Sequence, residues 1–97
     1  MARLCVKASP QGNVRRYELL LEGVDEDFIG PDGTGCVDLP DNNCGDGSEH
    51  VLKYALFGEI GAKLNVKLFC DGHQIRNYDI EIFPPGGEMQ GDARFRL

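Results

Sequence analysis

The chain has 97 residues, 41% of them hydrophobic and 27% charged, which is typical of one globular domain spanning residues 1–97. Ten basic and 16 acidic residues give a net charge of −6, and this charge disfavours nucleic acid and anionic membranes as partners. Since no run of about 18 apolar residues is present, we expect no membrane-spanning helix and a soluble chain.

The N-terminal part predicts two strands. Residues Arg3–Ser9 alternate in polarity, and Ser9–Asn13 has the composition of a turn. Residues Val14–Gly23 predict a second strand, antiparallel to the first. The inward positions of the two strands are Leu4, Val6, Ala8, Tyr17, Leu19 and Leu21. The first residues lack the continuous apolar stretch of a secretory signal, which favours the cytoplasm or a processed chain.

Residues Val24–Glu49 predict a long acidic loop, because regular alternation gives way to Gly, Asp, Asn and Pro. No Lys or Arg lies between Arg16 and Lys53. One short strand is expected inside the loop, at Cys36–Leu39. Half of the acidic residues gather in this region, namely Asp25, Glu26, Asp27, Asp32, Asp38, Asp41, Asp46 and Glu49.

Residues His50–Ile60 are apolar on both faces of a strand, which predicts a central strand. One face would pack against the opposing sheet, and we expect the long loop to cover the other. The next stretch, Ala62–Phe83, holds two alternating runs joined at Asp71 and Gly72, the strongest short-range signal for a hairpin.

The register of this hairpin is ambiguous. A two-residue turn would place Val66 opposite Asn77, so that the apolar side chains of the second arm change face. A β-bulge at Arg76 and Asn77 restores the pattern and turns Ile75 inward, and we favour this solution. A three-residue loop at residues 70–72 also aligns the arms but leaves Ile75 outward.

The chain ends with a predicted loop at Glu88–Asp92 and a strand at Ala93–Leu97, in which Phe95 and Leu97 point inward. Six to seven strands separated by turns predict an all-β fold. We expect a small antiparallel β-sandwich, immunoglobulin-like or similar, with one long acidic loop.

The four cysteines allow two interpretations. A disulfide between Cys36 and Cys44 is sterically easy and would stabilise the fold by roughly 2.5 kcal/mol through chain entropy. In a chain without a secretory signal, however, reduced thiols compete with this assignment. Cys70 shares a face with apolar residues and is expected to be a buried free thiol.

These residues include ligand types that suit two cations. Calcium would take oxygen ligands from Asp41, Asn43, Asp46 and Glu49, although the spacing departs from the EF-hand pattern. Zinc fits less well. A two-residue turn would oppose Cys70 and His73, with Cys36, Cys44 and His50 as further ligands, but these spacings match no familiar zinc motif. We therefore expect no cofactor, with calcium as the alternative.

No residue pattern indicates catalysis, so we expect a non-enzymatic protein-interaction or assembly module. Its partner would be a protein with a basic surface, bound through an acidic loop. The partner-binding candidates are Asp25, Glu26, Asp27, Asp32 and Asp38. A divalent-cation module is the alternative function. Self-association through the C-terminal strand is a further possibility, although Arg94 and Arg96 are of the kind that blocks edge pairing.

Overall fold

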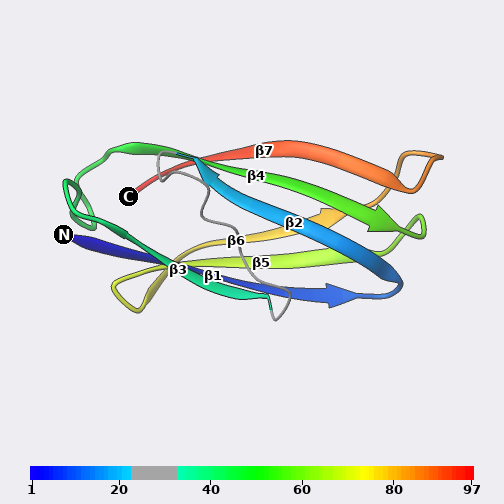
Figure 1. The fold of residues 1–97 in the computed structure, drawn as a ribbon, viewed down its shortest axis with the longest axis horizontal. Helices are drawn as coiled ribbons and strands as arrows, with labels where there is room; N and C mark the ends of the chain where they lie inside the picture. Colours follow the sequence, from blue (N-terminus) through cyan, green and yellow to red (C-terminus); the bar gives the residue numbers. More distant parts are fainter. Residues whose placement is uncertain (23–32) are drawn as a thin grey trace.

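The fold, seen in a computed structural model, is a sandwich of two antiparallel sheets (Figure 1). The structure describes residues 1–22 and 33–97. These residues form the strands β1 (Ala2–Gln11), β2 (Val14–Glu22), β3 (Thr34–Leu39), β4 (Glu49–Gly58), β5 (Lys63–Cys70), β6 (His73–Glu81) and β7 (Glu88–Arg96). One sheet has the order β3-β1-β5-β6 and the other the order β2-β4-β7. The all-β, two-sheet prediction is confirmed.

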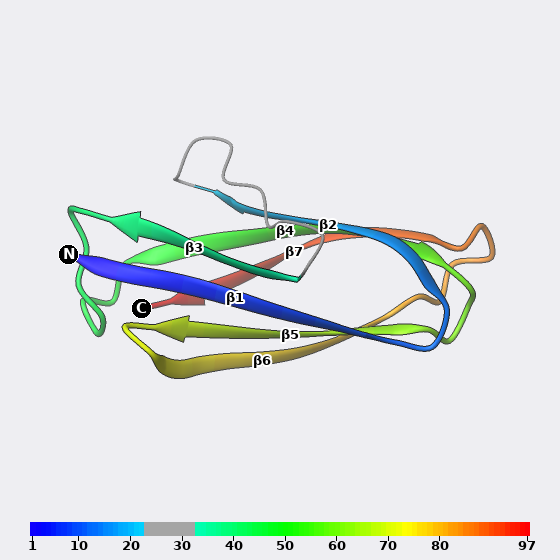
Figure 2. The ribbon, with the colours of Figure 1, turned by 60° about the horizontal axis from the view of Figure 1, so that its bottom comes forward.

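The chain changes sheet at every connection except the β5–β6 hairpin. Strands β1 and β2 run in opposite directions, as expected, but they lie in different sheets, and β2 pairs with β4 (Figure 2). In immunoglobulin domains the first two strands lie side by side in one sheet. The immunoglobulin-like assignment is therefore not confirmed. No helix long and apolar enough to cross a membrane occurs within the described ranges.

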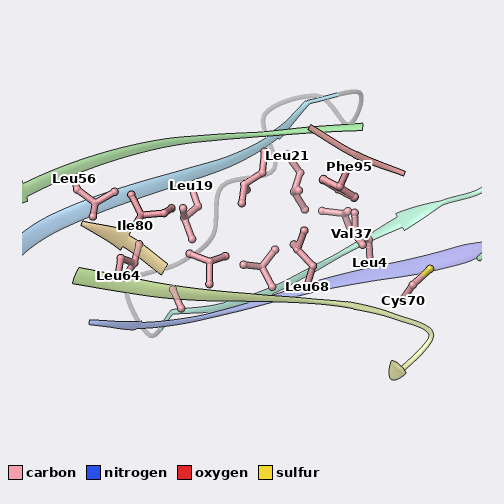
Figure 3. Close-up of a cluster of buried hydrophobic side chains, with 14 of the residues drawn as sticks. Leu4, Leu19, Leu21, Val37, Leu56, Leu64, Leu68, Cys70, Ile80 and Phe95 are labelled. Carbon is pink, nitrogen blue, oxygen red and sulfur yellow. The ribbon is translucent and has the colours of Figure 1, made fainter. Parts of the chain in front are cut away.

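The core fills the space between the sheets with the side chains that alternation had placed inward (Figure 3). Each strand contributes every second residue, so the two inner faces form one apolar cluster. Its fully buried members include Leu4, Val6, Leu19, Leu52, Leu56, Leu64, Val66, Leu68 and Ile82. The inward positions predicted for the first two strands are thus confirmed, with Tyr17 packed at the margin of the cluster.

The β5–β6 hairpin has the two-residue turn that we favoured. Asp71 and Gly72 have φ angles of 49° and 85°, which suits a turn that needs positive φ at both central residues. Leu68 pairs with Arg76 while Phe69 pairs with Gln74, so Ile75 is the extra residue of a β-bulge. The bulge lies one residue nearer the turn than expected.

Strand β4 is central, as predicted, between β2 and β7. Its expected cover by the long loop falls largely on residues 23–32, outside the described residues. The prediction of a loop at Glu88–Asp92 is wrong, because β7 begins at Glu88. Gly91 interrupts the alternation of apolar and polar residues in this stretch. It pairs with Tyr54, whose ring lies against it and occupies the space that a side chain would need.

Candidate functional site

At one end of the sandwich, residues 40–48 connect β3 to β4; we call them the anchored loop. Both chain termini and the β5–β6 turn lie at this end (Figure 1). The amino group of Met1 donates to Asn43 Oδ1 at 2.9 Å. The amide of Gly47 donates to the Leu97 carbonyl at 3.2 Å, and the Leu97 amide donates to the Ser48 carbonyl at 3.1 Å. The loop is thus tied to both ends of the chain.

Two disulfides staple this region. Cys44 in the anchored loop is bonded to Cys70 at the end of β5, and Cys5 of β1 is bonded to Cys36 of β3. The predicted Cys36–Cys44 bridge is therefore wrong, as is the free thiol at Cys70. The cause is strand register, since β3 pairs Cys36 directly with Cys5. Cys70 is only 1% exposed, and it faces Cys44 from beneath the loop.

The Asp46 carboxylate organises the anchored loop from within. It accepts hydrogen bonds from the Ser48 hydroxyl and amide at 2.6 and 2.8 Å, from the Asn43 amide at 3.0 Å and from Asn42 Nδ2 at 3.1 Å. Hydrogen bonds to the charged form favour it, and those from Ser48 contribute most to holding the Asp46 pKa far below its ordinary value.

This network predicts a dependence of loop stability on pH. Because the folded-state pKa of Asp46 lies below its ordinary value of 3.8, the unfolded chain binds the proton more tightly. The stabilisation is complete at neutral pH and is lost as the pH falls below about 4. The Asp46→Asn variant should therefore lose less stability than the wild type between about pH 4 and pH 2, measured by chemical denaturation at each pH.

The matched control is Asp41→Asn, which removes a charge from the same loop and leaves the Asp46 hydrogen bonds in place. It should keep the acid sensitivity of the wild type. An Asp46→Asn variant with the same acid sensitivity as the wild type would contradict this role for the carboxylate.

The four calcium-ligand candidates are spread over the anchored loop and the start of β4, and most of their oxygen atoms already have partners. Asn43 Oδ1 accepts from the Met1 amino group, and Asp46 is saturated as described. Glu49 lies 3.6 Å from Arg94, and Asp41 is exposed. No group of three or more His, Cys, Asp or Glu side chains able to hold a metal ion occurs among residues 1–22 and 33–97. Within these residues the loop has the chemistry of a hydrogen-bonded structural element.

Most of the zinc-ligand candidates also have other partners. Cys70 and His73 are directly opposed across the hairpin, as the two-residue turn predicted. The Cys70 sulfur, however, is bonded to Cys44, and the other two cysteines are bonded to each other. His50 Nε2 lies 2.9 Å from the Ser48 hydroxyl, and its ring packs 5.9 Å from that of Phe95. These contacts leave no thiolate ligand.

Four of the five partner-binding candidates, Asp25, Glu26, Asp27 and Asp32, lie outside the described residues. The fifth, Asp38, is exposed on β3 opposite Arg3, with 3.6 Å between its carboxylate and the guanidinium. An exposed ion pair of this kind contributes at most about 1 kcal/mol. Asp38 is therefore exposed to solvent and only weakly paired.

A second candidate site, which alternation did not reveal, lies between the edge strands β6 and β7. We call it the β6–β7 groove; its volume is about 610 Å³. Its apolar lining comes from both sheets and from the chain after β6, and consists of Tyr54, Tyr78, Ile80, Phe83, Met89 and Ala93. Phe83 is 66% exposed, so the apolar lining of the groove reaches the surface.

Near the groove, a hydrogen bond joins the two sheets. Arg76 of β6 donates from Nη2 to the carbonyl of Arg96 in β7 at 3.3 Å, and from Nη1 to the carbonyl of Ile75 at 2.6 Å. Four charged side chains also line the groove, namely Asp79, Glu81, Asp92 and Arg94. The result is an apolar floor with a mostly acidic rim.

Sequence reasoning missed this groove because it depends on which strands are edges. The available signal was Phe83, which follows the inward Ile82 and so falls on the opposite face, next to two prolines.

Comparison with known proteins adds no family to this description: no family model, curated protein or solved structure matches the chain.

Proposed function

We propose that the protein is a non-enzymatic protein-interaction module that binds an extended segment of a partner in the β6–β7 groove. The observation that carries the proposal is the groove itself, an apolar floor beneath two strand edges. Peptides bind such edges by adding a strand, so that main-chain hydrogen bonds supply affinity and alternate side chains enter pockets. An extended segment with an apolar side chain at every second position fits this arrangement.

The rim charges indicate the chemistry of the partner. Three carboxylates against one guanidinium favour a segment whose outward side chains are basic. The acidic residues Asp25, Glu26, Asp27, Asp32 and Asp38 would serve the same partner by long-range attraction, which raises association rates. The proposal thus assigns the expected basic partner to one site, the β6–β7 groove.

The two disulfides favour an oxidising compartment as the place where this module works, since such bonds persist there and are rare in the cytosol. The cytoplasmic setting favoured at the start thereby loses support. In such a compartment, binding through a strand edge on a stapled scaffold requires no metal or cofactor.

The test uses a synthetic peptide in which lysine and valine alternate. Its length is about six residues, that of a typical strand. Isothermal titration should detect binding to the wild-type chain. The Phe83→Ser variant should bind about tenfold more weakly, because a buried aromatic contact contributes at least about 1.4 kcal/mol to affinity. A peptide with glutamate in place of lysine should not bind.

Ile60→Ser is the matched control, because Ile60 is 61% exposed but does not line the groove. Its peptide affinity should equal that of the wild type. Equal affinities of the Phe83 and Ile60 variants, or no binding of the lysine peptide to a chain that is monomeric in the assay, would refute the groove as the binding site.

A further inference from the structure

Strand β7 has a free edge beside the β6–β7 groove. It pairs with β4 on one side, and no described strand lies on its other side within the sheet. The Leu97 amide donates to Ser48 on the β4 side, so the even-numbered residues of β7 point their amides and carbonyls to the free edge. Arg96 agrees with this, because its carbonyl accepts from Arg76 across the groove. The edge is therefore a row of groups ready for a further strand.

The outward side chains of β7 change sign along the strand. Glu88 and Asp92 occupy the first part, with Gln90 between them, and Arg94 and Arg96 occupy the last part. An antiparallel copy of the same strand would reverse this order. Acidic and basic halves would then lie opposite each other, so the strand is complementary in charge to itself.

Three central registers keep the inward face of both copies on the same side. Centring on Ala93 opposes Asp92 to Arg94 twice and Gln90 to Arg96 twice. Centring on Asp92 would oppose two aspartates. Centring on Gly91 would oppose Arg94 to Glu88 but leave Arg96 without an opposite residue in the strand, whereas the Ala93 register uses both arginines and leaves only Glu88 without one. The Ala93 register also keeps the Arg76 contact, because a carbonyl oxygen has two lone pairs.

We propose that β7 pairs with β7 of a second copy of this chain, antiparallel and centred on Ala93, giving one continuous six-stranded sheet. This rests on the proposed function because it uses the same strand edge. The added segment is β7 of another copy, whose basic outward residues are Arg94 and Arg96 and whose acidic ones are Glu88 and Asp92. In this arrangement Met89 and Ala93 of the second strand lie on the inward side, over the opening of the groove. Arg94 also lies 3.6 Å from Glu49 in its own chain, but both side chains are exposed and the pair is weak.

The test is a charge reversal with rescue, measured by sedimentation velocity over a series of concentrations. The wild type should shift from monomer to dimer as concentration rises. Arg94→Asp should weaken the dimer about tenfold or more, because two attractive cross-strand pairs become repulsive. The double variant Asp92→Arg/Arg94→Asp restores both pairs in the Ala93 register and should recover the wild-type constant within about threefold.

Glu88→Arg is the control, since the position opposite Glu88 in this register lies beyond the end of β7 at Arg96. It should dimerise like the wild type. At concentrations where each chain is monomeric, all variants should keep the wild-type melting temperature because these side chains are exposed. A double variant as weak as Arg94→Asp, or a wild type that stays monomeric, would overturn the pairing. A monomeric wild type that still binds the lysine peptide would overturn the self-pairing alone. Loss of both peptide binding and dimerisation would refute the groove proposal as well.

Discussion

Leu19→Ala is expected to lower the free energy of unfolding by about 3 kcal/mol, the middle of the range for truncating a buried leucine. Leu19 is fully buried on β2, within the cluster between the sheets. Truncation removes apolar contacts from both sheets and leaves a cavity that paired strands cannot easily close. In a domain of this size the melting temperature should fall by about 15 °C, measured by thermal unfolding.

The next residue provides the matched control. Leu20 lies on the opposite face of β2 and is 41% exposed, so Leu20→Ala makes the same chemical change without opening a cavity in the core. We expect its effect to stay within about 0.5 kcal/mol. Similar losses for the two variants would mean that β2 does not have the observed register.

This contrast also shows what could be predicted from the sequence. Alternation is local, and a strand with one buried face allows only one assignment of its residues. Alternation alone therefore assigns Leu19 to the inward face and Leu20 to the outward face, as in the structure. The same reasoning identified β4 as central, because both of its faces are apolar.

Features that depend on non-local pairing could not be predicted in this way. Cys36 lies closer in sequence to Cys44, but the β1–β3 register places it beside Cys5, and nothing within residues 36–44 reports that register. The β6–β7 groove has the same origin. The sequence around Phe83 and Met89 does not indicate that β6 and β7 are edges of different sheets, and the groove forms only because they are.

The candidate site was predicted only in part for a further reason. Asp41, Asn43, Cys44 and Asp46 are close together in the sequence, but their chemistry depends on hydrogen bonds and a disulfide made after folding. Asp46 is a residue type that binds metal ions, but its carboxylate accepts hydrogen bonds from Ser48 and Asn43. Asn43 in turn binds the chain terminus. Oxygen-rich loops with glycine therefore predict either a cation site or a self-capped loop, and backbone geometry decides between them.

Removing the Cys44–Cys70 disulfide is expected to lower the free energy of unfolding by about 3.5 kcal/mol and to free the anchored loop. The bond closes a loop with a sequence separation of 26, and the chain-entropy relation gives this magnitude. The Cys44→Ala/Cys70→Ala variant should show the loss in denaturant unfolding. Hydrogen exchange should also quicken at the amides of Gly47 and Leu97, whose bonds depend on the position of the loop.

The Cys5→Ala/Cys36→Ala variant separates the global effect from the local one. Its sequence separation of 31 predicts a nearly equal entropic loss, about 3.7 kcal/mol. Because this bond joins β1 to β3 and is not attached to the anchored loop, the Gly47 and Leu97 amides should stay protected while the β3 amides exchange faster. If both variants quicken the same amides equally, the staples act only on the unfolded chain, and Cys44–Cys70 has no separate role in holding the loop. A selective effect would show that the Cys44–Cys70 bond holds the anchored loop in place in the folded chain.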